Sequence, residues 1–209
     1  MIYASRLLDI VRDTVRRYMN RLAQLIHKLS GGRISPNSIT LFGLFAHIPI
    51  AWLIATRHNI RAAVLLVIFG LFDALDGSLA RLQNKASNSG MLLDASTDRM
   101  KEVMLYSGAA YALIASGYSY WAVWAVTACG ASLVVSYVKA KGETAVAGGK
   151  LTANQVNRLF QDGLMRFEVR MFFLVVGLLT NHLRFAVVAI AILASITAVS
   201  RLRAIMKKL

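Results

Sequence analysis

The chain has 209 residues, of which 57% are hydrophobic and 16% are charged, and its formal net charge is +14. Soluble domains carry about 25% charged residues, so this composition favours a membrane protein. A single cysteine excludes an intramolecular disulfide, and four scattered histidines without metal-ligand spacing argue against a zinc site. The basic residues lie at the ends of apolar runs, so we expect no nucleic-acid partner.

Residues 3–29 have the pattern of an amphipathic helix, with hydrophobic residues at helical spacing and basic residues between them. Gly31 and Gly32 end this pattern. Ser35 is then the expected N-cap, and Pro36 the first residue, of the next helix. We expect residues 1–33 to be a juxtamembrane segment whose helix lies in the lipid headgroup region. Packing of this helix on protein neighbours is the alternative.

Six apolar segments follow, each close to the roughly 20 residues that a helix needs to cross the hydrocarbon core. They predict an all-α membrane protein with a bundle of six transmembrane helices over 34–209, preceded by the interfacial helix. The whole chain, 1–209, is then a single domain. The expected spans are 36–56, 61–83, 90–117, 119–141, 164–181 and 183–205.

The basic residues also predict an orientation. With the N-terminus in the cytoplasm, 21 of the 24 lysines and arginines lie on the cytoplasmic side, and only Arg57, Arg61 and Arg184 lie outside. This asymmetry is the positive-inside pattern of a multi-pass protein of the plasma membrane. The polar segment 142–163 is expected to be a cytoplasmic loop. Its Gly148-Gly149-Lys150 lacks the spacing of a phosphate-binding loop, so we expect a flexible turn there.

Four of the ten acidic residues fall within the second and third expected spans. Asp73 and Asp76 are three residues apart and Asp94 and Asp98 are four apart, so each pair shares a helix face. The short connection between the helices lets the four carboxylates converge near the cytoplasmic side. Charged groups inside a membrane are costly and need a partner or a function. Oxygen-only ligands favour Mg²⁺ or Mn²⁺, and two such ions could clamp a pyrophosphate.

The residues between these carboxylates suit a nucleotide pyrophosphate. Gly77 and Ala80 have almost no side chain, so a ligand can approach the helix closely, and Gly90 leaves similar space before Asp94. Arg81, one turn beyond Gly77, offers a planar guanidinium to phosphate oxygens. A membrane proton or cation transporter could also use intramembrane carboxylates, but it would not need these small residues and an arginine at fixed spacing.

The complete pattern resembles the signature of the CDP-alcohol phosphotransferase family. It reads Asp73-Ala-Leu-Asp76-Gly77-Ser-Leu-Ala80-Arg81, eight residues, Gly90, three residues, Asp94, three residues and Asp98, and it matches at every fixed position. The resemblance implies phospholipid biosynthesis, in which a metal-dependent enzyme transfers a phosphatidyl group from a CDP-linked lipid of the CDP-diacylglycerol type to an alcohol and releases CMP.

The resemblance also implies roles for individual residues. Two metal ions would be held by Asp73, Asp76, Asp94 and Asp98, and Asp98 would also be the general base for the acceptor hydroxyl. The element Pro36-Asn37-Ser-Ile-Thr40 is similar to a family element that lines the nucleotide site. The residues expected to bind the CDP-linked lipid are Asn37, Thr40, Asp76, Gly77, Ala80, Arg81 and Ser87.

The sequence specifies the acceptor alcohol less closely than the CDP-linked donor. Lys139, Arg166 and Arg170 are expected at the cytoplasmic face, where they suit a phosphorylated acceptor, although basic residues also serve there as ordinary topology anchors. The stretch Ser136-Tyr137-Val-Lys139-Ala140, and Gly163-Leu164 followed by Arg170, resemble the phosphatidylinositol-phosphate synthases and their archaeal counterparts. This favours inositol phosphate as the acceptor.

Two expectations stay open at this point. The inositol-type branch usually carries Glu-Arg-Pro where this chain has Arg166-Phe167-Glu168. A phosphatidylglycerol-phosphate synthase, which uses glycerol 3-phosphate, is therefore the alternative. Small residues such as Gly108, Ala109 and Ala112 would permit the close helix contacts of a homodimer.

Overall fold

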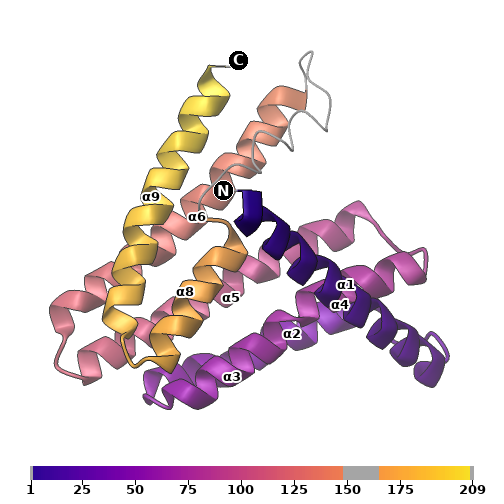
Figure 1. Ribbon diagram of the computed structural model, residues 1–209, viewed down its shortest axis with the longest axis horizontal. Helices are drawn as coiled ribbons and strands as arrows, with labels where there is room; N and C mark the ends of the chain where they lie inside the picture. The colour runs from indigo at the N-terminus through magenta and orange to yellow at the C-terminus, as the bar shows by residue number, and fades with distance from the viewer. Residues whose placement is uncertain (1, 148–164, 208–209) are drawn as a thin grey trace. The chain divides into compact units, whose positions relative to one another are not determined.

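The computed structural model describes residues 2–147 and 165–207, and this part of the chain is helical with short turns and no strand. The all-α prediction is therefore confirmed for these residues. The helices (Figure 1) are α1 (Ile2–Ser30), α2 (Pro36–Ala55), α3 (Asn59–Gly70), α4 (Phe72–Leu82), α5 (Asn88–Ala115), α6 (Ser119–Ala147), α8 (Phe167–Leu179) and α9 (Leu183–Met206).

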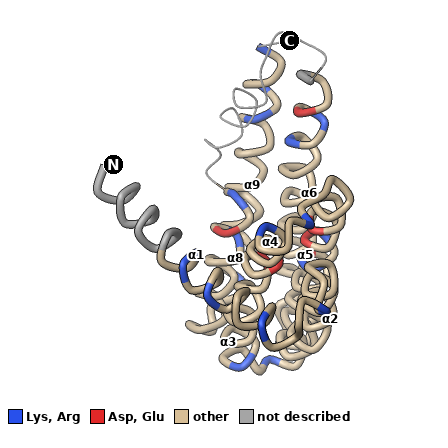
Figure 2. The backbone as a smooth tube through the Cα atoms, turned by 90° about the vertical axis from the view of Figure 1, so that its right-hand side faces the viewer, with Lys and Arg blue, Asp and Glu red and all other residues tan. Residues whose placement is uncertain are grey.

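Four helical segments are long and apolar enough to cross a membrane: Pro36–Ala55, Asn59–Leu82, Ser119–Ala145 and Leu183–Met206. They coincide with the first, second, fourth and sixth expected spans. Helix α5 has the length but carries five charged residues between Asp94 and Glu102. Helix α8 has 13 residues and begins close to residues outside the described part. Figure 2 shows the basic residues, in blue, recurring along several helices, while the acidic residues, in red, are few.

The expected helix 61–83 is interrupted at Leu71. The Leu71 amide donates to Ile68 O at 3.2 Å, three residues back, which is the tighter bonding of a 3₁₀ turn. Helix α4 therefore starts anew at Phe72, and Asp73 falls in its first turn.

The expected loop 142–163 is wrong at its beginning, because α6 continues to Ala147. Gly142 does not end the helix, since Lys139 and Glu143 pair across it at 3.8 Å and the Thr144 hydroxyl donates to Ala140 O. The rest of the expected loop, together with Gly163 and Leu164, lies outside the described residues.

One turn type ends five helices. Gly31, Arg57, Asn84, Gly117 and Asn181 each have a positive φ, between 52° and 79°. In each case the next residue's amide donates to a carbonyl five positions back, as in His58 N to Leu53 O at 2.8 Å and His182 N to Gly177 O at 2.8 Å. This is the Schellman motif, which satisfies the last carbonyls of a helix. At the other end, Ser38 N donates to Ser35 Oγ at 3.1 Å, so the predicted cap before Pro36 is confirmed.

The chain separates into two compact units. The first comprises Met1–Pro49 and Val64–Lys101, and the second Ile50–Ala63 and Glu102–Leu209. In the first unit α1 packs on α4, and the core contains Ala23, Ile39, Leu75 and Leu79 with Met19 and Ile26 against it. The apolar face of α1 is thus divided: one row packs on protein, whereas Tyr18, Leu22, Leu25 and Leu29 are exposed.

In the second unit α9 runs beside α6 and also packs on α8 (Figure 1). Close approach depends on two glycines. A methyl group on Gly108 would overlap Ala51 O, and one on Gly177 would overlap the Ala186 side chain. Ala109 and Ala112 are also buried within the chain, at 0% and 3% exposure. The small residues expected to favour a homodimer are therefore used for packing inside one chain, and the homodimer stays a prediction.

Candidate active site

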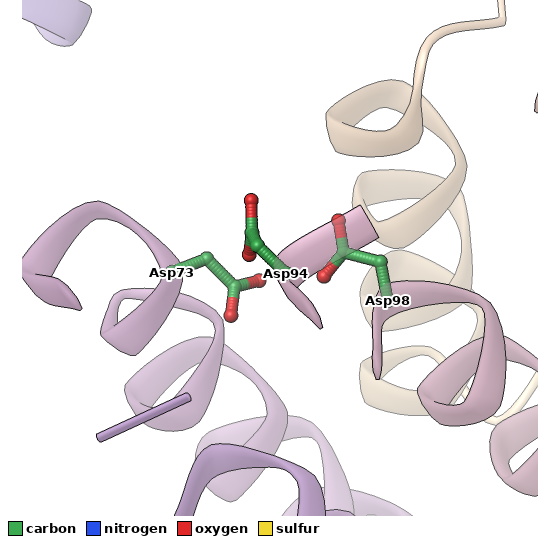
Figure 3. A group of neighbouring side chains, drawn as sticks. All are labelled: Asp73, Asp94 and Asp98. Atoms are coloured by element: carbon green, nitrogen blue, oxygen red, sulfur yellow. The ribbon is translucent and has the colours of Figure 1, made fainter. Parts of the chain in front are cut away.

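Three aspartates of the first unit converge (Figure 3). Asp73 comes from the first turn of α4, and Asp94 and Asp98 lie one turn apart on α5. One carboxylate oxygen of each lies within 4.8 Å of the others. The spacing of four residues places Asp94 and Asp98 on one face of α5, and the short connection after Leu82 brings this face back to Asp73. The convergence expected from the residue spacing is therefore present for Asp73, Asp94 and Asp98.

The fourth aspartate, Asp76, is engaged with α2. Thr40 Oγ1 donates to Asp76 Oδ2 at 2.5 Å, and both residues are buried. Asp76 lies outside the group of three within the described residues. Because a carboxylate that accepts a hydrogen bond on one oxygen keeps its other oxygen and remaining lone pairs, Asp76 can still act as a ligand.

The expected lipid-donor residues belong to the same unit as these carboxylates. The Arg81 guanidinium folds back over Gly77, where a methyl group would lie 3.5 Å from Arg81 Nη1. Arg81 Nη2 donates to Ser78 Oγ at 3.2 Å, which fixes the direction of the guanidinium. Ala80 lies between Leu79 and Arg81 on the same helix and is partly exposed. The Arg81 guanidinium thus lies against the side of α4 that carries Gly77.

Asn37 and Ser87 also lie together. A methyl group on Gly90 would be 3.3 Å from Ser87 Oγ and 3.6 Å from Asn37 Oδ1. The Gly90 amide donates to Ser87 Oγ at 3.1 Å, so Ser87 is the N-cap of α5. The structure therefore brings together Asn37, Ser87 and Gly90, although Ser87 has a capping role that the sequence argument did not anticipate.

The expected acceptor residues belong to the second unit. Lys139 on α6 is exposed and pairs with Glu143 at 3.8 Å. Arg166 is the exposed N-cap residue of α8. Arg170 differs from both, because its guanidinium is buried, donates through Nε to Glu102 Oε1 at 2.8 Å and donates through Nη1 to Met165 O at 2.7 Å. Arg170 thus holds α8 to α5.

The family follows from a direct comparison. Residues 33–200 match the CDP-alcohol phosphatidyltransferase family, a stretch that covers well over half of the chain. The chain belongs to the CDP-alcohol phosphatidyltransferase family. The resemblance drawn from the aspartate pattern is therefore confirmed, and the converging carboxylates lie within the matched region.

Two relatives within this family are named for related reactions. The chain is 39% identical over 128 residues to the phosphatidylinositol phosphate synthase of Corynebacterium glutamicum, an alignment that covers 58% of this chain and 56% of that protein. It is 27% identical over 203 residues to the archaetidylinositol phosphate synthase of Pyrococcus horikoshii, covering 97% and 98%. The match thus spans just over half of the bacterial relative and nearly all of the archaeal one.

Solved structures show the same fold. The phosphatidylinositol phosphate synthase of Mycobacterium tuberculosis with CDP-DAG bound superposes with a TM-score of 0.76 at 22% identity, covering 90% of this chain and 94% of that chain. The same enzyme in complex with manganese and citrate gives a TM-score of 0.75 at 22% identity, covering 90% and 88%. The helical fold is therefore that of a CDP-alcohol phosphatidyltransferase.

The clustered carboxylates of Asp73, Asp94 and Asp98 suit a hard divalent cation. Its donors are all oxygens, which Mg²⁺ and Mn²⁺ prefer. Asp94 Oδ1 is buried and has no hydrogen-bond partner among the described residues. Because an unpaired buried carboxylate oxygen is costly, a cation at this position would satisfy it.

Sequence reasoning missed three charged residues. Lys101 was counted only among the basic residues that predict the orientation, and Glu102 was not singled out, yet both are fully buried. Their spacing of three and four residues from Asp98 was the available signal, because it places them on the face of α5 that carries the carboxylates. Arg201 on α9 is buried and donates to Val135 O at 3.3 Å.

Proposed function

We propose that this protein transfers a phosphatidyl group from a CDP-linked lipid to the hydroxyl of a small polar alcohol and releases CMP. The observation that carries the proposal is the convergence of Asp73, Asp94 and Asp98 within 4.8 Å, beside Gly77 and Arg81. Family membership supports the reaction class, and the CDP-DAG bound to the Mycobacterium tuberculosis enzyme supports the donor.

The four aspartates are proposed to hold two divalent ions, Mg²⁺ or Mn²⁺. Asp73, Asp94 and Asp98 supply the grouped oxygens, and Asp76 supplies the oxygen that Thr40 leaves free. When bound, such ions neutralise pyrophosphate charge and stabilise negative charge that develops on transfer. The manganese in the Mycobacterium tuberculosis enzyme supports this assignment.

The donor site is proposed to follow α4. Gly77 and Ala80 leave the helix backbone open, so the nucleotide part of the lipid can lie directly against it. Arg81 donates to phosphate oxygens of the CMP portion, where charge increases as it leaves. Asn37 and Ser87 border the same space near Gly90, and Thr40 orients Asp76 through its hydrogen bond.

Asp98 is proposed as the general base. It takes the proton of the acceptor hydroxyl while that oxygen attacks the phosphorus attached to the diacylglycerol part. A new P–O bond forms to the acceptor, and the bond from this phosphorus to the bridging pyrophosphate oxygen breaks. The bridging oxygen leaves with CMP, and the product is a phosphodiester lipid.

Inositol phosphate is the proposed acceptor. The names of the Corynebacterium and Pyrococcus relatives support it, and exposed Lys139 and Arg166 can donate to a phosphate. Arg170 is proposed as a third member of this basic set, beside its bonds to Glu102 and Met165. Glycerol 3-phosphate is the competing acceptor, because it presents the same phosphate to the same cations.

The proposed setting is the plasma membrane, with six spans and the aspartates facing the cytoplasm. Four spans are supported by length and composition; α5 and α8 would complete the six. The exposed row of Tyr18, Leu22, Leu25 and Leu29, flanked by arginines, suits a helix α1 that rests in the headgroup region while its other row packs on protein. We further propose that residues 1–209 form one domain and that the protein is a homodimer.

An acceptor panel tests this function. Purified protein in detergent is given CDP-diacylglycerol and Mg²⁺ with inositol phosphate, glycerol 3-phosphate, inositol or serine, and the lipid product is identified by mass spectrometry. The proposal expects the inositol phosphate product to dominate. A dominant glycerol phosphate product would reassign the acceptor but keep the reaction class, whereas no product with any acceptor would contradict the reaction class.

A further inference from the structure

A lysine ammonium lies within the cluster of Asp73, Asp94 and Asp98. Lys101 lies on α5, one turn beyond Asp98, and is 0% exposed. Its ammonium donates to Asp73 Oδ1 at 2.5 Å and to Asp98 Oδ1 at 3.2 Å. One side chain thus bridges Asp73 of α4 and Asp98 of α5, and all three residues belong to the first compact unit.

This position has a direct consequence for metal binding. Asp73 and Asp98 are two of the three residues whose oxygens lie within 4.8 Å of one another. The oxygen atoms that Lys101 contacts are therefore on the side chains that would hold a divalent ion. An ammonium and a divalent cation repel each other strongly at such separations, and burial weakens the screening of that repulsion. They cannot both contact Asp73 and Asp98 closely without a free-energy cost.

We propose that Lys101 is the internal counter-ion of this centre: its ammonium bridges Asp73 and Asp98 when metal is absent, gives way when a divalent ion binds, and thereby sets the metal affinity. The inference rests on the proposed function only in requiring that the aspartates bind metal. The flexible four-carbon stem of lysine allows the ammonium to move without movement of the helix. Lys101 is a positioning residue in this account, since its effect passes through the carboxylates.

The bridge also has a role in the protein without metal. Three carboxylates at this separation repel one another, and Lys101 compensates part of that charge while it links α4 to α5. A purely structural lysine would produce this stabilisation too. The two roles differ in metal affinity, because only a counter-ion that competes for the same oxygens weakens divalent binding.

Lys101→Met tests the difference, since methionine keeps an unbranched chain of similar length and removes the charge. Binding of Mn²⁺ to detergent-purified protein is measured by titration followed by electron paramagnetic resonance, which reports free Mn²⁺ directly. Thermal unfolding is recorded with and without Mn²⁺. Lys85→Met is the matched control, because Lys85 belongs to the same unit but is exposed in the connection after α4.

We expect Lys101→Met to lower the Kd for Mn²⁺ by about tenfold or more, to lower the Tm without metal, and to enlarge the rise in Tm on adding Mn²⁺. Lys101→Arg, which keeps the charge, should keep an affinity nearer to that of the wild type, and Lys85→Met should bind as the wild type does. A variant that folds only when Mn²⁺ is present supports the same conclusion.

Three results would overturn the inference. They are an unchanged or weaker Mn²⁺ affinity in Lys101→Met, a variant that fails to fold with and without Mn²⁺, and equal gains in affinity for Lys85→Met. Failure of the proposed function looks different: in that case the wild-type protein itself binds no Mn²⁺ at the aspartates, and Asp94→Asn does not change its titration.

Discussion

Arg170 and Glu102 form a buried ion pair between α8 and α5, with 2.8 Å between Arg170 Nε and Glu102 Oε1 and side-chain exposures of 1% and 0%. The pair joins Arg170, which was expected to bind the acceptor, to Glu102, which the sequence pattern did not single out. Arg170 therefore has a structural role in addition to any contact with substrate.

Breaking this pair should destabilise the protein. Arg170→Met leaves the Glu102 charge buried without its guanidinium, and we expect a loss of about 3–5 kcal/mol in the free energy of unfolding. Thermal unfolding in detergent measures the effect. Lys139→Met is the control, because its pair with Glu143 is exposed and is worth about 0–1 kcal/mol. Equal Tm values for the two variants would show that the buried pair contributes no more than the exposed one.

Some features of the site could be predicted from the sequence, whereas the partners of Arg170 and Thr40 could not. Apolar length predicted the helices that carry the site, and the spacing of Asp94 and Asp98 predicted a shared helix face. These features are local, because helical periodicity alone determines them. The bonds of Arg170 to Glu102 and of Thr40 to Asp76 span 68 and 36 residues, and no local pattern contains them.

The errors of the sequence reasoning are also local in origin. The fourth span was expected to end at residue 141, but a glycine at 142 costs a helix only about 1 kcal/mol relative to alanine, and the pair between Lys139 and Glu143 continues across it. Leu71 gave no signal of a break, since leucine is a good helix former. Lys101 and Glu102 were missed because the cost of an intramembrane charge was considered only for the four aspartates, although buried lysine and glutamate side chains need partners as well.

The hydroxyl of Thr40 should contribute to both the stability and the activity of the protein. Thr40→Val keeps the shape of the side chain but removes the donor to Asp76 Oδ2, leaving a buried carboxylate oxygen unpaired at a cost of about 1–3 kcal/mol. We expect a lower Tm and about tenfold lower activity, from the same free-energy scale, whereas Thr40→Ser should restore most of both. Unfolding and CMP release measured on the same preparations test this, and a serine variant as impaired as the valine variant would argue against the hydrogen bond.

Gly108 and Gly130 offer a matched pair of glycines. A methyl group on Gly108 would overlap the Ala51 carbonyl, while one on Gly130 would meet no atom within 4 Å. Gly108→Ala should therefore destabilise the protein by about 1–3 kcal/mol through overpacking. Gly130→Ala should stabilise it by about 0.5–1 kcal/mol through helix propensity. Tm values that shift in the same direction would contradict the packing between α2 and α5 within the second unit.

A substitution at Asp98 should reduce catalysis while it leaves most of the metal binding intact. Asp98→Asn keeps an oxygen for coordination but cannot take a proton, so we expect activity to fall by about 10²–10⁴-fold while most of the Mn²⁺-induced rise in Tm remains. Glu168→Gln removes an exposed carboxylate from α8 and should keep wild-type activity. Retention of activity by Asp98→Asn would remove Asp98 from the role of general base.

Transfer of a phosphatidyl group at the aspartate cluster is tested by the ratio of CMP released to phosphodiester lipid formed from CDP-diacylglycerol. We expect equal amounts of the two products, both dependent on an added acceptor and on a divalent cation and both abolished by a chelator. Release of CMP without a lipid product, or equal product formation in the presence of the chelator, would contradict it.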